Sequence, residues 1–324
     1  MTTPLAGCFP GQGSQSVGML DALAAVYPLV RETFAEASDA LDRDLWTLVS
    51  AGPADALDQT ENTQPAMLTA GVAVWRVWQA QGGPTPTIMA GHSLGEYTAL
   101  VAADALSLAD GVRLAAARAR FMQAAVPLGQ GAMAALIGLT DAQAVALCAE
   151  QAQGAVLEAV NFNAPGQVVI AGEAAAVARA IAAAPAAGAK RALPLPVSVP
   201  SHCALMRPAA AQLAERLDAL DLRVPRVPVL HNVDVTAADS LAGLKERLCM
   251  QLYQPVRWVA TMAAMSTGGV RLALEFGPGK VLTGLNKRID KAMTARPVFD
   301  PDTLAAALTL ALSAVHEETT HAHG

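Results

Sequence analysis

The chain has 324 residues, of which 53% are hydrophobic and 15% are charged, and its formal net charge is −6. This length supports a substantial core in one or two domains, and the acidic balance argues against nucleic acid as the main partner, because phosphate binding needs clustered Lys and Arg. No apolar run reaches membrane-spanning length and no secretory signal pattern is present, so we expect a cytoplasmic protein with no membrane partner. The four cysteines have no Cys-x-x-Cys spacing, which indicates neither a metal site nor a disulfide framework.

The first part of the chain alternates short apolar strands with longer helical patterns. A strand is predicted over Leu5 to Phe9, helical patterns follow to about Ala80, and a second short strand covers Thr87 to Ala90. This alternation is typical of an α/β architecture with a parallel sheet.

The second strand leads directly into a Gly-x-Ser-x-Gly motif at 91–95. Gly91 and Gly95 permit a sharp strand-to-helix turn that exposes a serine hydroxyl, as in a nucleophile elbow. Ser93 is therefore the first candidate for a covalent nucleophile. The alternative, a tight glycine turn with an incidental serine, stays open until a partner for the serine is found.

The next predicted helix begins at Ser107, which with Asp110 resembles a capping box. Arg118 lies in the middle of an apolar stripe on one face of this helix, which also contains Leu114, Ala115, Phe121 and Met122. A guanidinium on such a face needs an anion, because its burial alone would be costly. Either a structural salt bridge or a bidentate clamp on a substrate carboxylate would meet this need.

A boundary is predicted at Pro127 to Gly131, after which the order of elements changes. From Ala132 to Val199 the pattern reads strand, helix, two strands, helix and strand, which is the order of a ferredoxin-like unit. We therefore expect a large α/β-hydrolase-like domain with a parallel sheet and an inserted small ferredoxin-like α+β subdomain. A cleft between two such bodies is a natural substrate site. The expected boundaries are 1–127 and 200–310 for the large catalytic domain, 128–199 for the subdomain, and 311–324 for a disordered polar tail.

After Pro200 the α/β pattern resumes. The expected elements are a helix from about Ala204 to Leu220, a strand near Val227 to Leu230, a helix pair around Leu244 to Met265, a strand over Leu272 to Phe276, and a last helix from Val281.

A serine nucleophile needs a base, and three histidines lie outside the tail. His92 is next to Ser93 and should point away from its hydroxyl, while His231, at the end of an apolar strand, is a pocket-lining or core histidine or, as the less favoured choice, the base. His202 lies where a strand gives way to a helix, a place where catalytic loops cluster. It is the best candidate for the general base that activates Ser93.

With Ser93, Arg118 and His202 in view, the chain resembles the malonyl-CoA:acyl carrier protein transacylases of bacterial type II fatty acid synthesis, from about Leu5 to Ile289. Seven motifs in the same order make this resemblance far more specific than one elbow. They are Phe9-Pro10-Gly11-Gln12-Gly13-Ser14-Gln15, Gly91-His92-Ser93-Leu94-Gly95-Glu96, Arg118 with Phe121-Met122-Gln123, Asn161-Phe162-Asn163-Ala164-Pro165-Gly166-Gln167, Pro200-Ser201-His202-Cys203, Gln251-Leu252-Tyr253-Gln254-Pro255-Val256 and Gly277-Pro278-Gly279-Lys280.

The resemblance implies catalytic roles for five residues. Ser93 would carry the malonyl group and His202 would be its base. The backbone N–H groups of Gln12 and Leu94 would form the oxyanion hole. The family orients its histidine with a main-chain carbonyl, here that of Gln251, in place of a carboxylate.

The resemblance also implies the substrate pocket and the reaction. Arg118 would hold the malonyl carboxylate, and Gln64, Asn161 and Ser198 match positions near the pocket. The expected enzyme is a malonyl-CoA:acyl carrier protein S-malonyltransferase that works by ping-pong transfer and supplies fatty acid elongation. It would act as a monomer with no metal or bound cofactor, on malonyl-CoA and the phosphopantetheine thiol of acyl carrier protein.

Other functions stay open at this point. A free-standing polyketide or malonate decarboxylase malonyl transacylase would share every motif, whereas a serine thioesterase or esterase would share only the elbow and the base. A non-catalytic interaction module would tolerate loss of Ser93. Because acyl carrier protein is usually acidic, we also hypothesise a local basic docking surface. Its candidate residues are Lys190, Arg191, Lys280, Lys287, Arg288 and Lys291.

Overall fold

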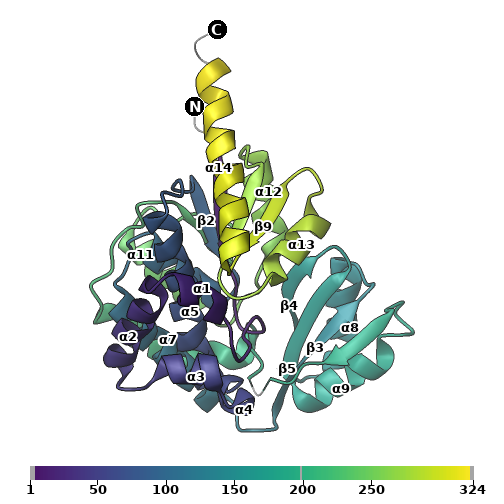
Figure 1. Cartoon of the computed structure of the whole chain (residues 1–324). Coiled ribbons are helices and arrows are strands. Elements are labelled where there is room, and N and C mark those ends of the chain that lie inside the picture. Colours follow the sequence, from purple (N-terminus) through teal and green to yellow (C-terminus); the bar gives the residue numbers. More distant parts are fainter. Residues whose placement is uncertain (1–3, 198, 322–324) are drawn as a thin grey trace.

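The computed structural model describes residues 4–197 and 199–321, with side chains described up to residue 313. Its frame is a five-stranded parallel sheet and a four-stranded antiparallel sheet. The antiparallel sheet and its two helices form a smaller unit beside the main body (Figure 1). The predicted α/β fold class is confirmed.

The parallel sheet has the strand order β7-β2-β1-β8-β9. Its central strand β1 is buried along its whole length, as expected where helices cover both faces of a parallel sheet. Phe9 at the end of β1 pairs with Gly91 at the end of β2, so the loops that follow these two strands meet at one edge of the sheet. The bounds are β1 (Leu5–Phe9), β2 (Ile88–Gly91), β7 (Val229–Leu230), β8 (Leu272–Phe276) and β9 (Thr294–Val298).

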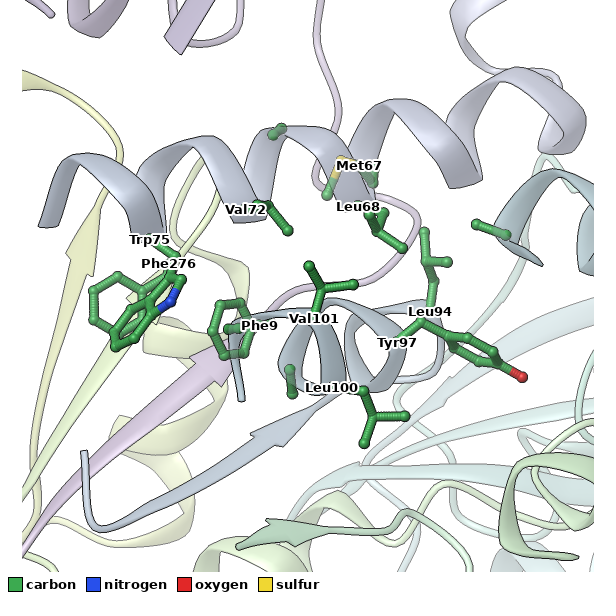
Figure 2. Close-up of a cluster of buried hydrophobic side chains, with 14 of the residues drawn as sticks. Phe9, Met67, Leu68, Val72, Trp75, Leu94, Tyr97, Leu100, Val101 and Phe276 are labelled. Carbon is green, nitrogen blue, oxygen red and sulfur yellow. The ribbon is translucent and has the colours of Figure 1, made fainter. Parts of the chain in front are cut away.

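Side chains of β1 alternate between two cores. Phe9 packs on Phe276, with ring centroids 5.7 Å apart, and Trp75 of α5 meets the same phenylalanine edge-on (Figure 2). Ala6 and Cys8 face the opposite core. The first core is the larger, and its helices are α1 (Asp21–Val26), α2 (Leu29–Leu41), α3 (Leu45–Ala51), α4 (Ala54–Leu57), α5 (Thr60–Ala80), α6 (Leu94–Ala102), α7 (Leu108–Ala125), α10 (Arg207–Asp218), α11 (Leu241–Met250) and α14 (Pro301–His321); the second core is covered by α12 (Trp258–Thr267) and α13 (Val281–Ile289).

The antiparallel sheet has the strand order β4-β5-β3-β6. Ala134 and Leu136 of β3 pack against one core with the two helices, whereas Met133 and Ala135 point to the other face, toward Cys203 of the main body. One face of this sheet is therefore free to line a site between the two bodies. The bounds are β3 (Gly131–Ile137), α8 (Asp141–Ala152), β4 (Leu157–Ala164), β5 (Gln167–Glu173), α9 (Ala174–Ala183) and β6 (Arg191–Pro194).

The structure differs from the sequence-based expectation mainly after Val281. Strand β9 was not expected, and it contains Pro297, which an edge strand tolerates because the proline needs no ladder hydrogen bond on its open side. Helix α14 continues to His321, so the segment expected as a tail from 311 is helical up to that residue. The helix expected from Ala204 begins as a 3-10 turn, η1 (Ala204–Met206). None of the helices in the described residues combines the length and apolar character needed to span a bilayer.

Candidate active site

Ser93 lies in a strained turn between β2 and α6. Its backbone has φ 52° and ψ −111°, a conformation that non-glycine residues rarely adopt. A Cβ on Gly91 would lie 1.8 Å from the carbonyl carbon of Gly95, and a Cβ on Gly95 would lie 2.0 Å from the carbonyl oxygen of Phe9. The two glycines are therefore required by the close approach of backbones, and the strand–turn–helix geometry expected of the motif is present.

The Ser93 hydroxyl faces a histidine from a distant part of the chain. Its Oγ lies 2.7 Å from Nε2 of His202, and Nδ1 of the same ring lies 2.7 Å from the carbonyl oxygen of Gln251. Because a carbonyl can only accept, Nδ1 carries the hydrogen and Nε2 is left to accept the hydroxyl proton. Burial, and then the positive charge of Arg118, lower the pKa of His202 to about 3. The imidazole is therefore neutral, as a general base must be.

Arg118 of α7 lies against the same hydroxyl with only 1% of its surface exposed. Nη1 donates to Oε1 of Gln64 at 2.9 Å, while Nη2 donates to Oε1 of Gln251 at 3.0 Å and to Oγ of Ser93 at 3.3 Å. These acceptors are neutral, and no acidic side chain among the described residues hydrogen-bonds or pairs with this guanidinium. The structural salt bridge considered above is therefore absent from the described part of the chain, and the buried charge has room for an external anion.

A cavity of about 110 Å³ lies in front of Ser93, between the two bodies. A larger cavity of about 490 Å³ shares Gln12, His92 and Asn161 with it and reaches the first turns of α13. The residues around the small cavity are Gln12, Thr60, Gln64, His92, Ser93, Leu94, Arg118, Met133, Asn161, Leu195, Val197, Val199, Ser201 and His202.

Most of the residues singled out from the sequence meet at this cavity. Gln12, Leu94, Gln64 and Asn161 line it together with Ser93, His202 and Arg118, and Gln251 contacts it through its bonds to the last three. Asn161 Oδ1 is buried with no hydrogen-bond partner in the part of the chain that the structure describes. Ser198 lies outside the described residues.

The structure also adds contributors that the sequence analysis did not assign. The side chain of Gln251 donates from Nε2 to the carbonyl oxygen of Ser93 at 3.0 Å, in addition to accepting from Arg118. Met133 supplies a wall from β3, and the alternation of that strand was a usable signal for it. Leu195 and Val197 also line the cavity, but no strand alternation could have predicted this, because both residues follow the end of a short strand.

The other two histidines point elsewhere. His92 Nε2 lies 2.7 Å from Oδ1 of Asn163, so the ring turns away from the Ser93 hydroxyl, as expected. His231 is fully buried, and its Nδ1 lies 2.7 Å from Oε1 of Glu96. It is a buried core histidine whose Nε2 has no hydrogen-bond partner among the described residues, and it has no hydrogen bond to Ser93, which leaves His202 as the candidate base.

An elbow serine and a neutral histidine held by a carbonyl have the arrangement of a nucleophile and its general base, and a buried cation lies beside them. The model of the acyl transferase domain family matches residues 8–289, and the chain belongs to this family. It is 58% identical to the malonyl CoA-acyl carrier protein transacylase of Salmonella typhimurium over 95% of this chain and 99% of that protein.

Solved structures agree with this assignment. An acyl carrier protein S-malonyltransferase from Vibrio cholerae has a TM-score of 0.91 and 54% identity, covering 93% of this chain and 99% of that chain. A malonyl-transacylase in complex with its holo type II PKS acyl-carrier protein has a TM-score of 0.93 and 53% identity, covering 95% of this chain and 99% of that chain. The family resemblance predicted from the seven motifs is confirmed.

Proposed function

We propose that this enzyme transfers the malonyl group from malonyl-CoA to the phosphopantetheine thiol of acyl carrier protein, through a malonyl ester on Ser93. The observation that carries the proposal is the buried Arg118 guanidinium, whose hydrogen bonds to the described residues all go to neutral oxygens, one of them the serine hydroxyl. A substrate carboxylate supplies the anion that this charge lacks, through two parallel hydrogen bonds. The names of the relatives support both the donor and the acceptor.

In the first half-reaction, Oγ of Ser93 attacks the thioester carbonyl while Nε2 of His202 takes the hydroxyl proton. The attack forms the carbon–oxygen bond and leaves a tetrahedral oxyanion. When this oxyanion collapses, the carbon–sulfur bond breaks and the same proton passes from His202 to the departing CoA thiolate. The backbone N–H groups of Gln12 and Leu94 stabilise the oxyanion between these steps. The Gln251 carbonyl keeps the imidazole in the tautomer that accepts at Nε2.

In the second half-reaction the order reverses with a different thiol. The phosphopantetheine thiol gives its proton to His202 and attacks the malonyl ester, and Oγ of Ser93 recovers the proton when the ester bond breaks. Arg118 holds the carboxylate throughout, so the acyl group stays in place while CoA leaves and the carrier enters. A thioester is already activated, so these residues complete the transfer without a metal or redox cofactor. We place the reaction in the cytoplasm and propose a monomer as its acting form.

The identity of the carrier is the open part of this function. Fatty acid elongation is the use that we propose, by analogy with the bacterial transacylases that the chain resembles. A polyketide carrier is the second candidate, because one structural neighbour is described with its type II PKS carrier protein. Transfer rates to carriers of the two kinds separate these uses.

Intact-mass measurement after incubation with malonyl-CoA tests the proposal. We expect a mass increase of one malonyl group on Ser93, absent in Ser93→Ala, and its transfer to holo carrier protein on addition. Release of free malonate without carrier, at the rate of acylation, would instead indicate a thioesterase. An adduct that persists in Ser93→Ala would overturn the nucleophile assignment.

A further inference from the structure

One buried asparagine side chain hydrogen-bonds to the backbone on both sides of the strained turn at Ser93. Asn232 follows β7 and is fully buried. Its Nδ2 donates to the carbonyl oxygen of Gly91 at 2.7 Å, and its Oδ1 accepts from the N–H of Ser93 at 2.7 Å. A single side-chain amide thus ties the end of β2 to the backbone of Ser93, the residue that precedes α6.

This asparagine is itself fixed by a buried carboxylate. Its own N–H donates to Oε2 of Glu96 at 2.9 Å, and Oε1 of Glu96 lies 2.7 Å from Nδ1 of His231. Glu96 and His231 are both fully buried, with 0% of their surfaces accessible to solvent. Burying a carboxylate is costly unless donors surround it, so Glu96 depends on the two donors that face it, Asn232 N–H and His231 Nδ1.

We propose that Asn232, held by Glu96 and His231, is a positioning residue that keeps the Ser93 backbone in its reactive conformation. A φ of 52° with ψ of −111° persists only where the surroundings fix it, and Asn232 binds the peptide groups on both sides of His92. The direction of the Ser93 hydroxyl and of the Leu94 N–H follows from that conformation. Asn232 lines neither cavity near Ser93, so it acts through the serine and not on the substrate.

This inference rests on the proposed role of Ser93 as nucleophile. A displacement of about 1 Å at a reacting group can cost roughly a hundredfold in rate. The pocket that binds malonate through Arg118 does not include Asn232. Loss of Asn232 should therefore lower kcat far more than it changes the KM for malonyl-CoA.

The test compares Asn232→Leu with Asn286→Leu in the full chain. Asn286 is also buried, at 2% exposure, and accepts from Trp258 Nε1 at 2.9 Å, but it lines neither cavity near Ser93. We expect both variants to lose thermal stability, while only Asn232→Leu loses about a hundredfold in kcat, with KM for malonyl-CoA within about threefold of the parent enzyme. Equal losses of kcat in both variants, or an unchanged kcat in Asn232→Leu, would overturn the proposal.

Should Asn232→Leu fail to fold, Glu96→Leu decides, because it nearly keeps the volume but removes both acceptor oxygens that fix Asn232 and His231. Partners that orient a reacting group in this indirect way typically matter by about 10–100-fold, by analogy with those around metal ligands, so we expect a loss of about tenfold in the rate of Ser93 acylation. An unchanged rate in a folded Glu96→Leu would refute the positioning role. The malonyl adduct on Ser93 of the parent enzyme, measured in parallel, separates this failure from a failure of the proposed function.

Discussion

Only 1% of the surface of Arg118 is exposed to solvent, and yet its hydrogen-bond partners among the described residues are all uncharged. Burial lowers the pKa of this guanidinium, which expresses the cost of holding its charge away from water. A hydrogen bond to a charged group is worth about 1.5–3 kcal/mol, so an arriving carboxylate regains much of that cost. On the proposed function, selectivity for a diacid thioester would follow from this unmatched hydrogen-bonding capacity of Arg118.

Replacing this residue should reverse that selectivity. We expect Arg118→Ala to lower kcat/KM for malonyl-CoA by about 100-fold or more, because two charge-assisted hydrogen bonds are lost. Transfer from acetyl-CoA should fall far less, since it never used them. Steady-state rates with both thioesters and one carrier protein measure the ratio directly.

The matched variant is Arg118→Lys, which keeps a positive charge but loses the planar fork. It should retain malonyl preference with a reduced rate, between the parent enzyme and Arg118→Ala. A malonyl-to-acetyl ratio that stays unchanged in Arg118→Ala would remove this residue from the carboxylate clamp.

The pH dependence of acylation follows from His202. Burial and the charge of Arg118 lower its pKa to about 3, so the neutral base is present throughout the range from pH 4 to 8. We expect kcat/KM for malonyl-CoA, which reports the free enzyme, to show no decline near pH 6.5. In Arg118→Ala, the acid limb measured with acetyl-CoA should move to higher pH, because one cause of the lowered pKa is gone. A limb near pH 6.5 in the parent enzyme would contradict this.

Stability sets the lower limit of that measurement. The unfolded chain binds a proton at His202 from about pH 6.5 downward, whereas the folded chain does not until about pH 3. This histidine therefore stabilises the folded state fully above pH 6.5 and progressively less as the pH falls toward 3. Circular dichroism at each pH identifies the range in which rates belong to folded enzyme.

At the scale of elements, the junction between β2 and α6 depends on contacts that allow no side chain at two positions. Gly95 sits in the first turn of α6, and a Cβ there would lie 2.0 Å from the carbonyl oxygen of Phe9. We expect Gly95→Ala to destabilise the fold by about 1–3 kcal/mol or more and to lower acylation strongly, because α6 must move off β1. Urea unfolding and the rate of malonyl adduct formation measure the two effects.

Gly284 in α13 is the control, because a Cβ at this position meets nothing within 4 Å. Gly284→Ala should leave acylation unchanged and stabilise the chain by about 0.5–1 kcal/mol, as expected for alanine in a helix interior. Equal stability of Gly95→Ala and the parent enzyme would show that the elbow tolerates displacement of α6.

What the sequence could predict differs between elements for physical reasons. The helical period of α7 was enough to predict that Arg118 lies among apolar neighbours. The glycine spacing was enough to predict the nucleophile elbow. Both signals are local in the sequence. Strand β9 was missed because Pro297 argues against a strand unless its edge position is known. The contacts of Asn232 and of the Gln251 side chain depend on tertiary packing across more than a hundred residues, which no local pattern contains.

At the scale of the whole molecule, the site exists only because two bodies meet. The antiparallel sheet contributes Met133 and Asn161 to the small cavity, and the main body contributes Ser93. Arg288 of α13 donates from Nη2 to the carbonyl oxygen of Pro165 at 3.1 Å, which links the bodies beside the larger cavity. A carrier protein must deliver its thiol through this region, so its docking surface should lie around the same edge.

The six basic residues proposed as a docking surface carry the last prediction, and two of them, Lys280 and Lys287, lie next to or within the helix α13 that lines the larger cavity. All six candidates are exposed, and apart from Arg288 none makes a side-chain hydrogen bond or ion pair with any residue that the structure describes. Unpaired positive charge beside a substrate opening attracts an acidic partner and speeds its encounter. We expect Lys280→Glu combined with Lys287→Glu to raise the KM for carrier protein about tenfold or more at low salt, with less effect as salt screens the charges.

The control reverses the charges of Arg223 and Lys245, which line neither cavity near Ser93. This double reversal changes the net charge by the same amount as the two lysine substitutions. At an ionic strength of about 0.1 M it should leave the carrier KM within about twofold of the parent value, because charges more than a Debye length of about 10 Å apart are then largely screened. Malonyl adduct formation from malonyl-CoA isolates the first half-reaction, which does not involve the carrier. If both double variants raise the carrier KM equally, the overall charge and not a local docking surface governs the encounter. If acylation of Ser93 in the lysine variant slows as much as transfer to the carrier, the two lysines act on CoA.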